Sequence, residues 1–375
     1  MNRKNHQPFI LRFMFNFLGC LGIQLTRLDW QKPWIIFGLL YRLTIFILFI
    51  HVLYSGSSVS FTYLDENYHN NAFLACFYMI YDQLYNLSYC IVTIYFFIYG
   101  AQIYSILNDD LIAQVYNGNH YHKSNRQSQI IFIILMLWIN FSFIRFHKDI
   151  LHFDQIIENW TTNIPLIFAY YTLYVHQFLP IMIYHYVKYA TKFHLFKNFQ
   201  LFQLQSSSSS SSSSLDLDSG EKLIQTVQSL AMINHHLDQM NSFNFFIPFI
   251  GNIIDCVVFF TNFQRNQNQI LDNITYHSSV IIHLVYVLYL NYCIQKIINQ
   301  IQKYLNNDHR RWQIMNIVDH RKRSIQIRLI EMANIYNEYF QMKIIQIFNA
   351  NFSLLLHMFC FILTFCILII QTTNS

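Results

Sequence analysis

Apolar residues are gathered in seven long blocks along the chain, and polar stretches separate them. The blocks occupy residues 33–55, 72–100, 128–146, 163–187, 243–263, 276–295 and 350–371. Each is long enough to cross about 30 Å of hydrocarbon as a helix rising about 1.5 Å per residue. A spanning segment must satisfy its own backbone hydrogen bonds, and these blocks are too long and too irregular for barrel strands. The pattern therefore predicts an all-α integral membrane protein with seven transmembrane helices.

The composition agrees with a membrane protein and excludes a soluble enzyme. Of 375 residues, 54% are hydrophobic, 18% aromatic and only 11% charged. A soluble domain usually has about 25% charged residues, so this chain has too few charges to cover a soluble surface. With only 8 Gly and 5 Pro, it also offers little support for Gly-rich phosphate loops. The formal net charge of +5 is a weak signal for nucleic acid, and no nucleic-acid partner is predicted.

The positions of Lys and Arg predict the orientation of the chain in the membrane. The N-terminal segment and the second, fourth and sixth loops hold 20 of the 24 basic residues, Lys188 of the fourth loop among them. Cytoplasmic segments keep the excess of basic residues. We therefore expect a cytoplasmic N-terminus and an extracellular C-terminus. Two sequons, at Asn159 and Asn273, fall in loops predicted to be extracellular and are candidate glycosylation sites.

Four regions follow from this topology. Residues 1–32 are predicted to be a cytoplasmic segment, 33–295 the first six spans with an outer ligand pocket, 296–349 a cytoplasmic helical anchor, and 350–375 the last span with a short outer tail. The serine run inside the fourth loop, about 205–220, is predicted to be disordered because it cannot bury apolar surface.

The sixth loop carries apolar residues at helical spacing, which predicts an amphipathic helix that continues directly into the last span. The residues on this face are Ile325, Leu329, Met332, Ile335, Tyr336, Phe340, Ile344 and Phe348. One interpretation is that the face packs against other copies of the chain beneath the membrane. The alternative is a helix that lies among the lipid headgroups beside the basic cluster 321–323.

Ionisable residues inside the apolar blocks are functional candidates, because they are costly at membrane depth. They are Arg42, Asp82, His176, His185, Asp255, His283 and His357. None of them forms a catalytic constellation or a metal-ligand motif, so no enzyme activity, metal or cofactor is predicted. For Asp82 and Asp255, hydrogen-bonded or ion-paired anchoring between helices is the structural alternative.

Aromatic side chains are concentrated in the outer halves of the predicted spans. Aromatic walls with a few polar tips suit a small organic ligand, although interfacial belts and simple packing use the same residue types. The candidate ligand-binding residues are Tyr78, Tyr81, Asp82, Tyr85, Trp138, Tyr170, Tyr171, Tyr174 and Asp255.

The last block contains a short pattern close to the C-terminus. Thr364 and Phe365 are followed by five hydrophobic residues, 366–370, and then by Gln371 and Thr372. This pattern resembles the signature of insect gustatory receptors, which is Thr-Tyr, five hydrophobic residues and Gln-Phe at an extracellular C-terminus. Phe365 stands for the signature Tyr, and Thr372 replaces the closing Phe. The predicted topology and the long sixth loop extend the resemblance over the whole chain.

The resemblance implies a ligand-gated, nonselective cation channel of four identical or different gustatory receptor subunits. Its expected partners are a small-molecule tastant, permeating cations and the lipid bilayer, in the plasma membrane of chemosensory neurons. The last helix of each subunit would line one pore, and the implied pore and gate residues are Thr364, Ile367, Ile370, Gln371 and Thr372. Cys366 stands where sugar-responsive members have Glu, which favours a bitter or other non-sugar ligand.

Two other receptor classes share parts of this pattern. An insect odorant receptor subunit that needs a co-receptor would have the same topology and channel design. A G-protein-coupled receptor is less favoured, because the charge bias is inverted and the chain lacks Asp-Arg-Tyr after the third span and Asn-Pro-x-x-Tyr in the seventh.

Overall fold

The computed structural model describes residues 94–117 apart from 97, 160–208, 220–242, 270–315, 320–344, 348–349 and 352–373, with isolated helical positions between 40 and 50 and between 130 and 144. Within these parts, the labelled helices are α4 (Asp110–Asn117), α7 (Trp160–Ser208), α9 (Ile270–Met315), α10 (His320–Phe340) and α11 (Phe352–Thr373). Residues 94–107, apart from 97, and 220–242 are also helical, and the latter segment is called helix 220–242 below. The predicted spans 33–55, 72–100, 128–146 and 243–263 lie wholly or largely outside the described residues.

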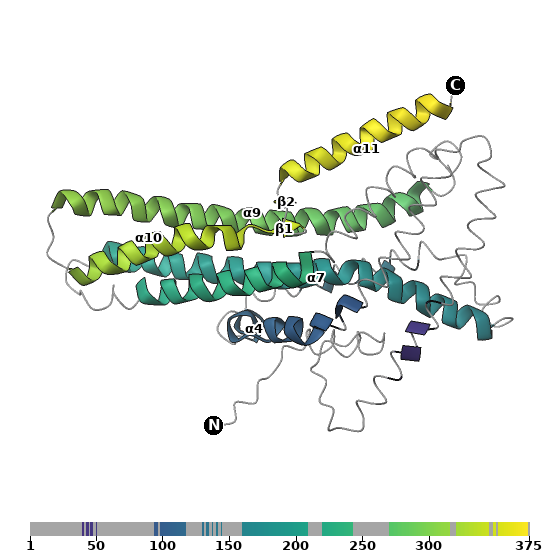
Figure 1. Cartoon of the computed structure of the whole chain (residues 1–375), viewed down its shortest axis with the longest axis horizontal. Helices are drawn as coiled ribbons and strands as arrows, with labels where there is room; N and C mark the ends of the chain where they lie inside the picture. Colours follow the sequence, from purple (N-terminus) through teal and green to yellow (C-terminus); the bar gives the residue numbers. More distant parts are fainter. Residues whose placement is uncertain are drawn as a thin grey trace.

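Long helices lying along a common direction form the main body of the described structure (Figure 1). The helix α7 packs against α9, α10 packs against α9, and the short α4 packs against α7. The last helix, α11, leaves this group at an angle (Figure 1). The described residues are thus almost entirely helical, as the hydrophobic pattern predicts.

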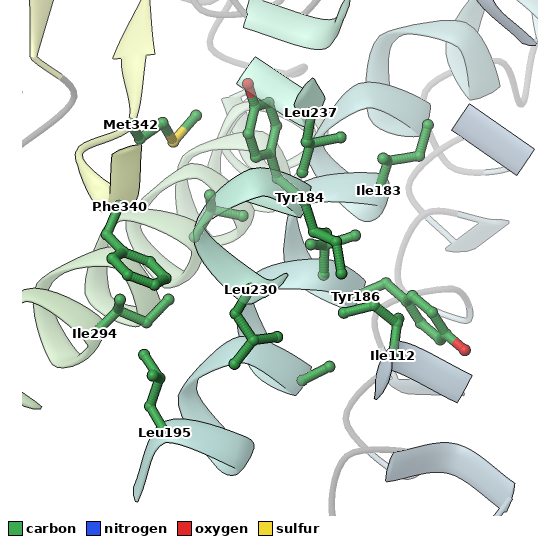
Figure 2. Close-up of a cluster of buried hydrophobic side chains, with 14 of the residues drawn as sticks. Ile112, Ile183, Tyr184, Tyr186, Leu195, Leu230, Leu237, Ile294, Phe340 and Met342 are labelled. Atoms are coloured by element: carbon green, nitrogen blue, oxygen red, sulfur yellow. The ribbon is translucent and has the colours of Figure 1, made fainter. Parts of the chain in front are cut away.

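The core lies between α7, helix 220–242 and α9. These helices contribute Tyr184, Leu195, Leu230, Leu237 and Ile294, all buried. Figure 2 shows these side chains in one cluster with Phe340 from the end of α10 and Met342 just after it. Removal of apolar surface from an aqueous or polar environment is the main favourable term in such packing. The end of α10 is therefore fixed to the same core as α7 and α9.

The helix α4 is joined to α7 by aromatic and polar contacts. Its first turn is capped by Asp109, whose Oδ1 accepts a hydrogen bond from the Leu111 N–H at 2.9 Å. The Tyr116 hydroxyl donates to the Tyr186 carbonyl at 3.0 Å, and the two rings stack with centroids 3.9 Å apart. The His194 Nε2 atom lies 2.5 Å from the Leu111 carbonyl oxygen. Burial lowers the pKa of His194, and this hydrogen bond opposes the shift.

The two longest helices extend beyond the predicted spans. The predicted span 163–187 is part of α7, which continues to Ser208, and the span 276–295 is part of α9, which runs from Ile270 to Met315. Both extensions lack Gly and Pro and are rich in good helix formers, so the helices do not end where the hydrophobicity falls. The predicted disordered stretch 205–220 was drawn too wide, because residues 206–208 and 220 are helical. In the described part of the chain, no helix meets the combined requirement of length and apolar character for a membrane span.

The Asn273 sequon was predicted to lie in a loop, and this was wrong. The helix α9 begins at Ile270 and includes residues 273–275 in its first turns. The sequence 270–275 has no Gly or Pro to delay the start of the helix. The second sequon, at Asn159, lies just before α7 and outside the described residues.

The predicted helical junction between α10 and the last span is replaced by a small antiparallel hairpin. The helix α10 ends at Phe340, and strand β1 (Lys343–Ile344) pairs with β2 (Phe348–Asn349) in the register Lys343 to Asn349 and Ile344 to Phe348. The Gln341 N–H donates to the Glu338 carbonyl at 3.1 Å and closes the final turn of α10. Isoleucines at 344, 345 and 347 explain the change, because β-branched residues favour strands. The hairpin is a small departure from the predicted all-α class.

Replacing Phe340 by Ala is expected to detach the end of α10. The ring is completely buried, so its removal leaves a cavity and costs about 3–5 kcal/mol. Glu331→Ala, at an exposed position on the same helix, is the control and is expected to change stability by no more than about 0.5 kcal/mol. Thermal unfolding of the purified chain in detergent measures both. Equal melting temperatures for the two variants would contradict the placement of Phe340.

Candidate functional site

The helix α11 exposes apolar side chains around much of its circumference in the single chain. Leu356 is 63% exposed and Ile367 is 55% exposed, and Phe359, Phe361 and Leu363 are also exposed. Ile362, by contrast, is only 7% exposed and belongs to the core cluster, with Leu354 and Phe365 packed against it. One side of α11 therefore contacts the rest of the subunit, while the remaining sides present a large apolar surface. Surfaces of this kind mark contacts with lipid or with other protein chains.

Four polar residues of α11 form a stripe on the side away from Ile362. At about 100° per residue, positions 353, 357, 364 and 371 fall within about 40° of one another, whereas position 362 lies roughly 160° from 364. The four residues are Ser353, His357, Thr364 and Gln371, and all are exposed.

Two of these polar groups are already bonded to their own helix. The Thr364 hydroxyl donates to the Cys360 carbonyl at 2.8 Å, and the His357 Nδ1 lies 2.6 Å from the Ser353 carbonyl oxygen. These local bonds satisfy the side chains without a partner from another helix. The polar stripe can therefore face either a water-filled space or an apolar surface.

The remaining pore candidates occupy different positions around α11. Ile367 flanks the polar stripe at about 60° from Thr364. Positions 370 and 372 lie roughly 120° and 80° from Thr364, outside the stripe. Both are in the last turns of α11, and at these two positions the structure describes only the backbone. The helical geometry thus places Thr364 and Gln371 together and puts Ile370 and Thr372 outside their stripe, while Ile367 lies between the stripe and Ile370.

Among the predicted ligand-binding residues, the structure describes a side-chain contact for Tyr171. The Tyr171 hydroxyl of α7 donates to the Asn140 Oδ1 at 2.6 Å. Tyr170 and Tyr174 lie in the same helix, but only their backbone is described. The other pocket candidates lie outside the described residues; they are Tyr78, Tyr81, Asp82, Tyr85, Trp138 and Asp255. The structure therefore brings one predicted aromatic residue into contact with an amide that the sequence did not single out.

A ladder of polar side chains lies between α7 and helix 220–242. Asn241 donates to the Pro180 carbonyl at 3.0 Å, and Asn234 donates to the Thr191 hydroxyl at 2.9 Å. Farther along, Asn198 donates to the Thr226 hydroxyl at 3.4 Å. The partner numbers rise on α7 as they fall on helix 220–242, so the two segments are antiparallel. Buried polar groups need such partners, and each contact fixes the same axial register.

The centre of this ladder holds a buried acid and a buried base. Asp238 and Lys188 are both buried, and Lys188 has no exposed surface at all. Tyr184 from α7 and Lys343 from β1 lie near the Asp238 carboxylate, and both favour its ionised form. Among the described residues, the Lys188 Nζ and the Asp238 Oδ1 have no hydrogen-bond partner. The two charges therefore attract each other through space rather than through a direct hydrogen bond.

Burial changes the pKa of both groups. Desolvation raises the pKa of Asp238 to about 6, although the Lys188 charge, the Tyr184 hydroxyl and Lys343 oppose that rise. Desolvation also lowers the pKa of Lys188, and the Asp238 charge opposes this shift. Each charge therefore favours the ionised form of the other.

Sequence reasoning missed this buried pair. Lys188 was counted as a charge of the fourth cytoplasmic loop, but it lies inside α7 and is buried. Its side of the membrane stays a prediction. The available signal was the spacing of Asn234, Asp238 and Asn241 at helical intervals among apolar residues. That spacing predicts a shared face of one helix, but it does not say that the face is covered. Within the described part of the chain, no group of three His, Cys, Asp or Glu side chains is arranged to hold a metal ion.

Comparison with known proteins gives a match at the level of the fold. No protein-family model matches the chain, and none of the curated proteins matches its sequence. Among solved structures, the insect olfactory receptor OR5 from Machilis hrabei matches with a TM-score of 0.66 at 12% identity, covering 96% of this chain and 98% of the receptor. The same receptor in complex with eugenol matches with a TM-score of 0.67, the same identity and the same coverage. The chain therefore has the fold of an insect olfactory receptor over nearly its whole length.

Proposed function

We propose that this chain is a subunit of a ligand-gated, nonselective cation channel of the insect chemoreceptor superfamily, and that it acts as a gustatory receptor for a small, non-sugar organic compound. The proposal places it in the plasma membrane of chemosensory neurons. The fold match over 96% of the chain carries the chemoreceptor assignment. The pattern from Thr364 to Gln371 supports the gustatory branch.

The pore is proposed to form where the α11 helices of four subunits meet. The exposed apolar surface of α11 supports this arrangement, because among the side chains that the structure describes on this helix, Ile362 is the buried one. In a tetramer, the polar stripe with Thr364 and Gln371 would face the axis, and the apolar flanks would contact neighbouring subunits or lipid. Among the gate candidates, Ile367 is the better placed for a dewetting constriction, because it flanks the stripe whereas position 370 does not. Thr372, which replaces the bulky signature Phe, would contribute little to such a barrier.

The ligand is proposed to bind beside the outer part of α7. The eugenol complex of the matching receptor shows that this fold accommodates a small aromatic compound in that protein. Here, Tyr171 offers an aromatic face and a hydroxyl fixed by Asn140. A ligand opens the channel only if it binds the open arrangement more tightly than the closed one. The proposed mechanism therefore requires the pocket around Tyr171 to change shape when α11 moves.

An odorant receptor subunit is the second candidate function. The observation in its favour is that both matching structures are olfactory receptors. At 12% identity this match does not separate the two branches. The distinguishing feature is the need of an odorant receptor subunit for a dedicated co-receptor.

The proposed pore predicts selective chemical access along α11. Cysteines introduced at Thr364 and Gln371, in a Cys360→Ala background, are expected to react with a positively charged thiosulfonate reagent and to lose roughly half or more of the ligand-evoked current. The background is needed because Cys360 is itself free and exposed. Whole-cell recording during reagent application is the measurement.

The matched control is Ile362→Cys in the same background, because Ile362 faces the core on the opposite side of α11. It should conduct normally and remain insensitive to the reagent. Equal block at positions 362 and 364 would show that α11 does not line the pore through the polar stripe.

Tyr171→Phe is expected to weaken the response to the active compound. The change removes the hydrogen bond to Asn140 and keeps the ring, so the half-maximal ligand concentration should rise about fivefold. Calcium imaging of expressing cells against a panel of tastants gives the dose–response curve. Tyr292→Phe, at an exposed position on α9, is the control and should leave the half-maximal ligand concentration unchanged. Identical curves for the wild type and Tyr171→Phe would remove Tyr171 from the pocket.

Expression with and without an odorant co-receptor decides between the two branches. A gustatory receptor of the proposed kind is expected to give ligand-evoked calcium signals when expressed alone. Signals that appear only with the co-receptor, at equal surface expression, would favour the odorant alternative.

A further inference from the structure

The imidazole of His357 is held in one tautomer by the backbone of its own helix. Its Nδ1 atom lies 2.6 Å from the Ser353 carbonyl oxygen, and the side chain is exposed. A carbonyl oxygen only accepts hydrogen bonds, so the proton of the neutral ring is on Nδ1 and the lone pair is on Nε2. Histidines that bind a metal ion usually donate their other ring N–H in this way, to a backbone carbonyl or a carboxylate. The Nε2 atom of His357 is therefore set up as a metal ligand on the surface of α11.

Cys360 provides a second ligand atom one helical turn away. It is a free and exposed cysteine. At about 100° per residue, position 360 lies about 60° from position 357 and about 40° from Thr364, on the side of the polar stripe. Residues three apart on a helix are neighbours, with about 5–6 Å between their Cβ atoms. Ligand pairs with this spacing bind metal ions in the cores of helical bundles. His357 and Cys360 together are called the His–Cys pair below.

A single chain does not complete a metal site around this pair. Within the described residues of one chain, no group of three His, Cys, Asp or Glu side chains is arranged to hold a metal ion. The helix α11 leaves the main group of helices at an angle (Figure 1), and its buried residue Ile362 lies on the opposite side from the pair. Further ligands must therefore come from another copy of the chain. In the proposed channel, the polar stripes of the subunits face one axis, so their His–Cys pairs lie at the same level.

We propose that the His–Cys pairs of two subunits form an inhibitory binding site for a thiophilic divalent transition-metal ion such as Zn²⁺. This inference rests on the proposed function, in which α11 lines the pore. Two pairs supply two imidazole nitrogens and two sulfur atoms, which is a ligand set that Zn²⁺ binds with tetrahedral geometry. Each thiol releases its proton to the solvent when its sulfur binds the ion.

The position of the site along α11 explains why a bound ion would inhibit. His357 precedes Ile367 by ten residues, or about 15 Å along the helix, so the site is separate from the proposed constriction. In the predicted topology it lies towards the cytosolic end of the pore, where an ion from the cytosol arrives without passing that constriction. A bound divalent ion would occupy the path and repel permeating cations. Mg²⁺ and Ca²⁺ prefer oxygen ligands, so the inhibition should be specific for metals that bind sulfur and imidazole.

Metal binding to the purified full chain in detergent tests the site without any current. The probe is Cd²⁺, because its bonds to thiolate sulfur give an ultraviolet charge-transfer band. The wild type is expected to show a saturable band that Cys360→Ala loses, and His357→Gln should weaken Cd²⁺ binding about tenfold or more. Because two pairs share one ion, saturation should need no more than about one Cd²⁺ per two chains.

The matched control is Cys366→Ala, which removes a different thiol from the same helix. Position 366 lies roughly 120° from position 360 around α11, away from the polar stripe. This variant should keep the saturable band and the Cd²⁺ affinity of the wild type.

Inside-out patch recording tests the inhibition. Zn²⁺ in the bath is expected to reduce the ligand-evoked current of the wild type, whereas Mg²⁺ at the same concentration should not. Each variant is compared with its own current before Zn²⁺ is added. The half-inhibitory Zn²⁺ concentration should rise about tenfold or more in Cys360→Ala and in His357→Gln, because each lacks one ligand of every pair. Cys366→Ala should be inhibited as the wild type is.

The outcomes separate the metal site from the proposed function. Equal Cd²⁺ binding in the wild type and in both ligand variants overturns the site, and saturation at one ion per chain overturns its sharing between subunits. Cd²⁺ binding without inhibition by Zn²⁺, or with equal inhibition in all variants, overturns the inhibitory role. A wild type that gives no ligand-evoked current overturns the proposed function, and the Cd²⁺ titration then still decides whether the site exists. If one ligand variant does not fold, the other tests the same site.

Discussion

The antiparallel contact between α7 and helix 220–242 is the constraint on which the rest of the described structure depends. Apolar packing alone would tolerate small axial shifts, but the ladder from Asn241 at Pro180 to Thr226 at Asn198 does not. A shift by one residue would leave several buried polar groups without partners, and each such group costs about 1–3 kcal/mol. The polar ladder therefore selects one register, and the apolar core of α9 and α10 is built on that register.

The parts of the fold that follow from local sequence were predictable. A 22-residue helix at the end of the chain follows from an apolar block without Gly or Pro, and the structure has it as α11. The polar stripe from Ser353 to Gln371 also follows from helical spacing. The extent of α7 was not predictable in the same way, because a hydrophobicity pattern reports where a helix meets lipid rather than where it ends. Its continuation to Ser208 depends on helix propensity and on packing against helix 220–242 and α9.

The candidate site was less accessible to sequence reasoning, and Lys188 and Asp238 show why. A lysine in a polar stretch is normally exposed, so its use as a cytoplasmic marker was reasonable. Its burial is set by helix 220–242, which lies about 50 residues away in the sequence and whose contribution no local pattern reveals. The hairpin at Lys343 was missed for a related reason. The isoleucines that follow α10 continue the helical spacing of its apolar residues, but they are also strong strand formers. The choice between the two is made by Phe340 and Met342, which enter the core.

The weak attachment of α11 to its own subunit has a consequence for any switching mechanism. Within the described residues, α11 contributes Ile362 as its buried side chain, so little packing energy opposes its displacement. The hairpin that joins it to the core is then a main restraint on its position.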